Sequence, residues 1–370
     1  MKRFSVNDSF SIKGIAIIFM IIHHCFRTGA VLSFGTHNIF CDPLKKYQVV
    51  NIADFGKLCV PIFAFLSGYG LYLSYIKAEN KRSWTITHLI KTLSVFWIIV
   101  ILQWSYYLLT SNRISSFYFK DGIPSGIIHM ITEFFGIASI LGFKTLDGGW
   151  WYMGTAVFFI IIIPFIYCLI KKSGAFSIFC FACLIPYVLK LGFMGNNPVS
   201  FFPIFCLGIL FVETCAFDKI DDTFQKIKQQ SLFLYIGSFL VSLLIVLLSY
   251  KTYTILEIKT FWLIKYSLIP LIIIIFAFQF IIKIPYLNNI LFFLGKHSFN
   301  IYLTHLFFRS QFNNFIYSVH NWILISALLL AVSLITSIII ENVKHFIHYD
   351  ILIKKITAFW NATSSIEVQH

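Results

Sequence analysis

The chain has 370 residues, of which 58% are hydrophobic and only 12% are charged, and its formal net charge is +14. A soluble domain carries about 25% charged residues, so this composition excludes a soluble protein and predicts an all-α polytopic membrane protein. The lysines and arginines are spread over short connectors and helix ends without forming a continuous basic stripe, which argues against nucleic acid as a partner.

Ten apolar segments are predicted to cross the bilayer, with both termini in the cytoplasm. They cover about residues 10–30, 54–76, 92–110, 150–170, 175–191, 201–217, 231–250, 262–282, 298–317 and 322–341. A further apolar run at 124–143 would make eleven crossings. Ten spans leave more of the 29 lysines and arginines on the inner side than eleven do, so the positive-inside rule favours ten. We therefore predict that 124–143, which contains His129 and Glu133, is re-entrant or interfacial.

The first span contains ionisable side chains on either side of a run of apolar residues, in the sequence SIKGIAIIFMIIHHCFR (Ser11–Arg27). In an α-helix Lys13 and His24 are about 16 Å apart along the axis and lie within about 20° of the same direction, whereas His23 points about 80° away. An ionisable group at the depth of His24 is costly and indicates a functional site. The alternative is a neutral histidine that is hydrogen-bonded to a neighbouring helix.

The second span, VPIFAFLSGYGLYLSY, is interrupted by Ser67, Gly68 and Gly70. Small residues allow either a ligand or another helix to approach the backbone, and both interpretations stay open here. Cys180 and Cys183 in the fifth span have CxxC spacing but no further ligands nearby, so no metal site is predicted.

The ninth span carries a polar stripe. Ser298, Tyr302, His305 and Arg309 follow one another at offsets of four, three and four residues, which places them on one face of a helix. Such a face is too costly to expose to lipid, so it is expected to line a cavity or to contact another helix. His305 would then lie at a depth comparable with that of His24.

Four segments together resemble the acyltransferase-3 family of membrane O-acyltransferases. KGIAIIFMIIHH is similar to its first-helix motif, a basic residue and a histidine separated by ten others, which Lys13 and His24 match. VPIFAFLSGYGL resembles the FFxxSGY segment, GWWYM at 149–153 resembles hxWFL, and LGKHSFNIYLTHLFF resembles LGxxSYxIYLxH. The segments occur in the family's order and cover nearly the whole chain. The family's ten-span topology agrees with the predicted count.

Two positions depart from the family pattern. The glutamate pair that often follows the WFL segment is replaced by Ala156 and Val157. The Arg-x-x-Arg of the first cytoplasmic loop reads HLIK, from His88 to Lys91. The resemblance therefore moves the expected contacts to the acyl-CoA phosphates onto Lys91, Arg82 and Lys81.

The resemblance implies a transmembrane acyltransferase domain at 1–345, followed by a cytoplasmic or interfacial tail at 346–370. It implies transfer of an acyl group, most simply acetyl, from cytoplasmic acyl-CoA to a hydroxyl of a cell-surface or lipid-linked carbohydrate. The location it implies is the bacterial cytoplasmic membrane, with membrane lipid as a partner and with neither a metal nor a further cofactor. His24 would be the general base or a transient acyl acceptor.

The other expected roles also follow from the resemblance. The expected catalytic residues are His24, Lys13, His305 and Tyr302, with His305, Tyr302 and Trp151 as hydrogen-bond donors to the thioester oxygen. The expected acyl-CoA contacts are Lys13, Arg82, Lys91, Ser67 and Gly68. The expected acceptor contacts are Trp151, Tyr152 and Arg309.

A secondary transporter is the alternative. The histidines would then relay protons, and the lysine or arginine would bind an anion. The sequence shows no inverted repeat and no pair of Gly/Pro-broken helices at corresponding positions, which favours the acyltransferase.

Overall fold

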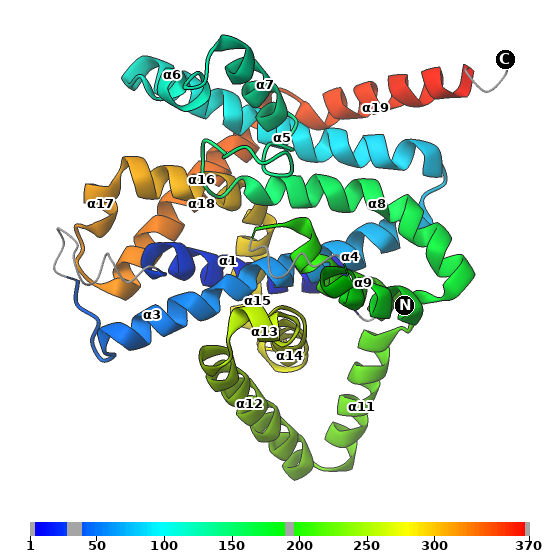
Figure 1. Cartoon of the computed structure of the whole chain (residues 1–370). Coiled ribbons are helices and arrows are strands. Elements are labelled where there is room, and N and C mark those ends of the chain that lie inside the picture. The colour runs from blue at the N-terminus through cyan, green and yellow to red at the C-terminus, as the bar shows by residue number, and fades with distance from the viewer. Residues whose placement is uncertain (1–3, 28–38, 189–195, 367–370) are drawn as a thin grey trace.

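The computed structural model describes residues 4–27, 39–188 and 196–366, and within these ranges the chain is helical without a β-sheet (Figure 1). The prediction of an all-α polytopic protein is confirmed. The first half contains α1 Val6–Phe26, α3 Lys46–Phe55, α4 Cys59–Lys77, α5 Lys81–Thr110, α6 Arg113–Tyr118, α7 Ile123–Phe134, α8 Trp151–Ser173 and α9 Ala175–Val188. The second half contains α10 Phe202–Glu213, α11 Ala216–Gln230, α12 Leu232–Ile255, α13 Ile258–Leu263, α14 Ile269–Phe276, α15 Pro285–Lys296, α16 Ser298–Gln311, α17 Asn313–Tyr317, α18 Trp322–Phe346 and α19 Tyr349–Ile366.

Seven helical segments of the described ranges are long and apolar enough to cross a membrane. They are α1, Lys46–Lys77, α5, α8, α12, Thr260–Ile281 and α18. An eighth results if the stretch Pro198–Gln230, bent by 67° between α10 and α11, forms one span. The predicted spans at 175–191 and 298–317 correspond to α9 and α16, which have 14 residues each and are about 21 Å long, shorter than the ~30 Å hydrocarbon core. Residues 189–191 lie outside the described residues. The count of ten and the cytoplasmic termini therefore stay predictions.

Helix α1 contacts α3, α4, α15, α16 and α18. It begins at a capping box in which the Asp8 N–H donates to Ser5 Oγ (3.2 Å) and the Ser5 N–H donates to Asp8 Oδ2 (2.7 Å). Its crossing with α15 brings backbone against backbone, because a Cβ at Gly14 would lie 2.1 Å from the Leu291 carbonyl oxygen. The spans predicted from the sequence did not include α15, whose residues lay between two of them.

Helices α4 and α10 cross equally closely. A Cβ at Gly68 would lie 2.0 Å from the Phe205 carbonyl oxygen, and one at Gly208 would lie 2.2 Å from the Phe65 carbonyl oxygen. Side chains larger than hydrogen do not fit there, so Gly68 serves helix packing. Gly68 does not line the cavity described below, and its expected contact with acyl-CoA stays a prediction.

The segment between α5 and α8 folds as two short helices and a loop at one end of the bundle (Figure 1). Helix α7 has only 12 residues and is not among the candidate spans, in agreement with the prediction that 124–143 does not cross. Glu133 at its end is 1% exposed and accepts hydrogen bonds from the Tyr118 hydroxyl and, at 2.7 Å, from the Leu146 N–H. The side of the membrane on which this segment lies stays a prediction.

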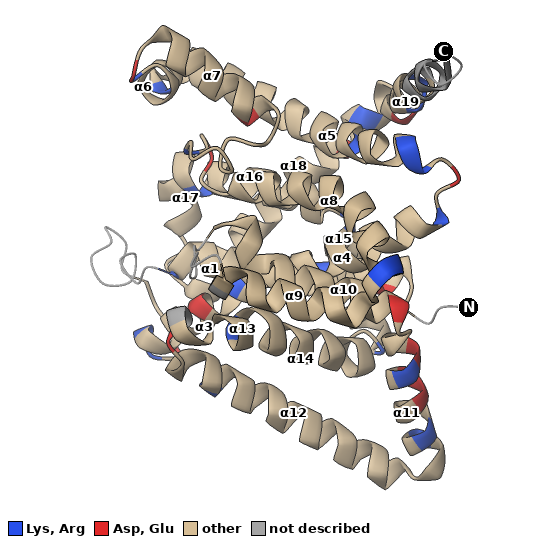
Figure 2. Ribbon diagram, turned by 45° about the vertical axis from the view of Figure 1, so that its right-hand side comes forward, with Lys and Arg blue, Asp and Glu red and all other residues tan. Residues whose placement is uncertain are grey.

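Helix α12 projects from the bundle and forms a V with α11 (Figure 1). Only 6% of its most apolar window is buried within the protein. Charged side chains gather on α11 and at the connection of α4 to α5, while α12 carries few along most of its length (Figure 2). Near the end of α12 the Tyr253 hydroxyl donates to the Asp54 carbonyl oxygen of α3 (3.1 Å).

Candidate active site

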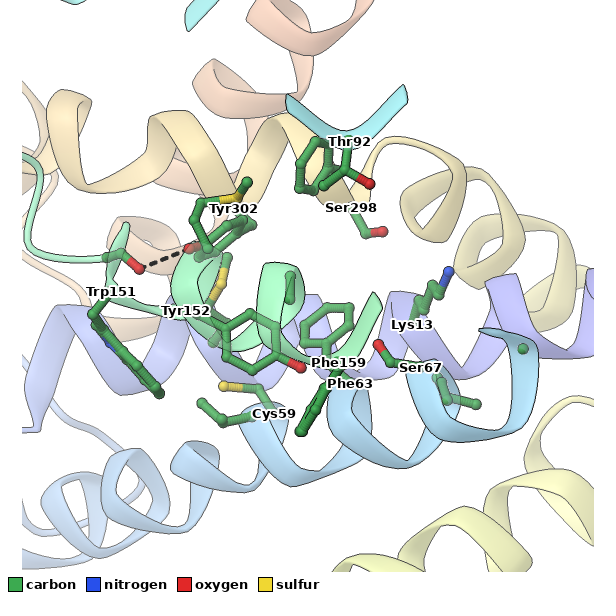
Figure 3. A pocket seen from close by; sticks show the side chains of 18 of the residues that line it. Lys13, Cys59, Phe63, Ser67, Thr92, Trp151, Tyr152, Phe159, Ser298 and Tyr302 are labelled. Carbon is green, nitrogen blue, oxygen red and sulfur yellow. Dashed lines mark hydrogen bonds between the residues drawn. The ribbon is translucent and has the colours of Figure 1, made fainter. Parts of the chain in front are cut away.

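A cavity of about 370 Å³ lies between α1, α4, α5, α8 and α16 (Figure 3). Its wall is mainly apolar, and Lys13 is the one charged lining residue among those that the structure describes. The other polar lining groups come from His24, Ser67, Thr92, Tyr152, Ser298 and Tyr302. An elongated ligand that extends from Lys13 to His24 would therefore cover about 16 Å of mostly apolar wall.

The two adjacent histidines of α1 have different environments. His24 is half-buried and lines the cavity together with Lys13. His23 is 6% exposed, and its Nδ1 lies 2.7 Å from the Ala53 carbonyl oxygen of α3. Since a carbonyl oxygen only accepts, Nδ1 of His23 carries the hydrogen. The predicted helix phase is confirmed, because it separates His23 from the face of Lys13 and His24.

His24 packs against His305 of α16, with ring centroids 4.9 Å apart and planes inclined by 51°. His305 is completely buried, and its Nδ1 donates to the carbonyl oxygens of Ile301 (3.1 Å) and Tyr302 (2.8 Å). Its Nε2, on the ring edge away from these carbonyls, has no hydrogen-bond partner among the described residues. In the neutral ring this nitrogen is an acceptor.

The loop before α8 is fastened to α16 by hydrogen bonds. The Tyr302 hydroxyl donates to the Gly149 carbonyl oxygen (2.8 Å, Figure 3), and Trp150 Nε1 donates to the Leu303 carbonyl oxygen (3.0 Å). The Gly149 N–H donates in turn to Asp147 Oδ1 (2.9 Å). The Tyr302 proton is thus engaged, so the expectation that this residue donates to a thioester oxygen is wrong in this arrangement.

The Tyr152 hydroxyl is placed differently. It lies in the cavity on the side of Ser67 (Figure 3), and its oxygen makes no hydrogen bond of regular geometry in the described part of the chain. Trp151 also lines the cavity. Two of the three residues expected to contact the acceptor, Trp151 and Tyr152, therefore belong to the wall, and Tyr152 offers an unused donor.

Residues 11–342 match the model of the acyltransferase-3 family, described as an acyltransferase domain. The chain belongs to the acyltransferase-3 family. Comparison with curated proteins and with solved structures gave no match. Membership and the apolar helices together make this protein an integral-membrane acyltransferase.

Some residues expected to serve this acyltransferase lie outside the cavity. Arg82 and Lys91 are exposed on α5 and do not line it. Arg309 Nε donates to the Tyr317 hydroxyl (3.4 Å), which donates to the Cys25 carbonyl oxygen (3.0 Å). Arg309 therefore contacts the residue after His24 through Tyr317 and is not part of the wall.

Ala156, one of the two positions that depart from the acyltransferase-3 pattern, lines the cavity, whereas Val157 is buried in the protein core. The cavity wall therefore carries an uncharged alanine at a position where the family often has a glutamate. Sequence reasoning also missed the apolar wall, including Met20, Cys59 and Phe63. Apolar residues on a membrane span are equally typical of helix packing, so the sequence alone does not distinguish residues that line a cavity from residues that pack.

Two buried carboxyl groups of the acyltransferase lie in the segment before α8. Burial raises the pKa of Asp147 to about 6, although the Gly149 N–H and the Arg113 charge oppose the shift. Burial raises the pKa of Glu133 to about 7, against the hydrogen bonds from Tyr118 and Leu146. Both groups therefore hold a proton more readily than an exposed carboxyl does.

Proposed function

We propose that the protein transfers an acyl group, most simply acetyl, from cytoplasmic acyl-CoA to a hydroxyl of a cell-surface or lipid-linked carbohydrate at the bacterial cytoplasmic membrane. The observation that carries this proposal is the contact of His24 with His305 on the wall of a cavity that also contains Lys13. A histidine suits general-base catalysis because its ordinary pKa lies near neutrality.

In this proposal His305 fixes the tautomer of His24. Nε2 of neutral His305 is an unused acceptor beside the His24 ring, and a small rotation of that ring would let it accept the N–H of His24 while the second ring nitrogen of His24 keeps its lone pair. A third group orients the base of a serine-protease triad by the same logic. His305 acts through His24, so it is a positioning residue.

The proposed transfer consists of one proton transfer to His24 and one from it, one bond formed and one bond broken. His24 takes the proton of the acceptor hydroxyl while the oxygen forms a bond to the thioester carbonyl carbon. The carbon–sulfur bond breaks, the proton passes from His24 to the departing sulfur, and the products are the carbohydrate ester and the CoA thiol. Negative charge develops on the carbonyl oxygen during attack, and the free hydroxyl of Tyr152, with Ser67 beside it, can bind that oxygen.

The test uses purified protein in proteoliposomes with radiolabelled acetyl-CoA, together with the surface glycans of a deletion strain. We expect CoA thiol release that depends on the glycan acceptor, and loss of glycan O-acyl esters that wild type restores and His24→Ala does not. Unchanged esters in the deletion strain would exclude the carbohydrate acceptor. Transfer that does not require acyl-CoA would exclude acyl-CoA as the donor.

A further inference from the structure

A second cavity, of about 410 Å³, adjoins the first. Phe299 at the start of α16 lines both. Helix α5 contributes Val95 to the second cavity, and α18 contributes Glu341 and Lys344. The two cavities therefore share Phe299 as a wall residue at the N-terminal end of α16, close to Ser298, which lines the first cavity together with Lys13.

The second cavity differs from the first in its charge. Lys296 and Lys344 line it, and Glu341 is its one acid in the described part of the chain. Glu341 is occupied by two donors, the Lys344 ammonium (2.8 Å) and the Asn300 amide (2.8 Å). The exposed Lys296 forms no ion pair among the described residues, and its ammonium lies over the Phe292 ring. The formal charge of the lining is thus positive.

Lys91 adds a further cation on the same side of α5, because it precedes Val95 by one helical turn. His297 bonds through Nδ1 to Ser337 Oγ (2.8 Å), which leaves its Nε2 available. Phosphate oxygens bind best where several cationic donors converge. The first cavity offers one ammonium and a mainly apolar wall, which suits a thioester and its arm but not several phosphate groups.

We propose that the second cavity binds the phosphate-bearing nucleotide end of acyl-CoA, with the arm passing Phe299 so that the thioester lies in the first cavity. This inference rests on the proposed function, in which acyl-CoA is the donor. It assigns Lys296 and Lys344 to phosphate binding. The phosphate of an anionic lipid headgroup shares this chemistry, so the experiment has to separate the two sources.

The experiment uses full-length protein in nanodiscs of phosphatidylcholine and measures the Kd of CoA and of pantetheine, which lacks the nucleotide. We expect wild type to bind CoA more tightly than pantetheine. Lys296→Glu should weaken CoA binding about tenfold or more and leave pantetheine binding unchanged, because a hydrogen bond to a charged group is lost. Lys226→Glu, an exposed lysine on α11, is the matched control and should change neither.

A second variant keeps the test valid if Lys296→Glu does not fold. Glu341→Gln retains an acceptor for Asn300 and Lys344 but removes the negative charge, so it should tighten CoA binding severalfold. Equal effects of Lys296→Glu on CoA and pantetheine, or none on either, would overturn the proposal. So would an effect that appears only in nanodiscs with anionic lipid, since the cavity would then hold a headgroup.

Failure of this inference is distinguishable from failure of the proposed function. If Lys296→Glu transfers acyl groups from acyl-CoA and from acyl-pantetheine as wild type does, the nucleotide site is wrong and the function stands. If neither donor supports transfer but Lys296→Glu still weakens CoA binding selectively, the site stands and the function is wrong.

Discussion

The ring of His24 lies against that of His305, which is itself held by the backbone carbonyls of α16. His24 belongs to α1 in the first part of the chain, and His305 belongs to α16 in the last part. His23, directly before His24, is instead bonded to α3. Neighbouring histidines on one helix thus have different environments, and substitutions can test whether their roles differ as well.

The first prediction concerns these neighbours. His24→Ala should lower turnover by about 10²–10⁴-fold, the usual contribution of a general base, while the protein still folds and binds acyl-CoA. His23→Ala should cost much less activity and should lower the Tm, since it removes the bond to Ala53. Turnover with purified variants and thermal unfolding measure both. The proposed site is wrong if His23→Ala abolishes transfer while His24→Ala retains most of the wild-type turnover.

The second prediction concerns His305. His305→Ala should reduce kcat less than His24→Ala, because in the proposed mechanism His24 remains the base and loses only the neighbouring ring that would set its tautomer. His305→Gln, whose side chain can still accept a hydrogen bond, should restore part of the rate. The pH–rate profile should shift in His305→Ala, which a purely structural role would not produce. A loss equal to that of His24→Ala, without rescue by glutamine, would mean that His305 is the base.

The third prediction compares two tyrosines of the cavity. Tyr152→Phe should lower kcat by about 10²–10³-fold, as expected for loss of a donor to the transition-state oxygen, with little change in Tm. Tyr302→Phe should lower the stability by about 1 kcal/mol, since it removes the bond to Gly149, and should reduce kcat less. Turnover and Tm of both variants decide this, and the reverse ranking of kcat would assign the donor role to Tyr302.

The fourth prediction separates two glycines of α4. Gly68→Ala should prevent stable folding, because its methyl group would lie 2.0 Å from the Phe205 carbonyl oxygen. Gly70→Ala meets no atom within 4 Å and should fold normally, although it narrows the cavity. Size-exclusion profiles in detergent test the pair. Normal folding of Gly68→Ala would contradict the close crossing of α4 with α10.

The fifth prediction is a pH dependence of stability. The folded-state pKa of Glu133, about 7, exceeds the ordinary value of 4.5 because of burial, so the folded protein binds this proton more tightly than the unfolded one. The resulting stability is complete below about pH 4.5 and is lost as the pH rises through about 7, by about 1.4 kcal/mol per unit of pKa difference at most.

Glu133→Gln stays neutral at every pH and should therefore lose less stability between about pH 5 and pH 8 than wild type. The Tm in detergent, measured across this range, reports the difference. Asp121→Asn, at an exposed position of the same segment, should follow the wild-type curve. Parallel curves for Glu133→Gln and wild type would show that Glu133 does not titrate in this window.

The sequence predicted the parts of the site that depend on helical phase. The common face of Lys13 and His24, and the stripe from Ser298 to His305, follow from spacing alone, because a helix fixes direction once its residues are known. Tyr302 shows what spacing leaves open. It lies on the expected face, but its hydroxyl is used by Gly149 of a loop whose path no periodicity defines.

The ends of the helices and the places where helices cross could not be predicted from the sequence. The bend between α10 and α11 and the separate helix α15 depend on contacts between distant segments, such as that of Gly14 with Leu291. An apolar stretch has the same composition whether it crosses the bilayer straight or is broken into shorter pieces. The number of spans therefore needs the tertiary structure as well as hydropathy.

The projecting helix α12 is connected through α3 to the helix that carries His23 and His24. Its apolar part, residues 232–250 before Lys251, is about 28 Å long and therefore close to the ~30 Å hydrocarbon layer. A thinner bilayer requires more tilt, and the end of α12 is bonded through Tyr253 to Asp54, next to the Ala53 that holds His23. We expect hydrophobic mismatch at the edge of the protein to act, through these two hydrogen bonds, on the backbone that anchors the helix of His24.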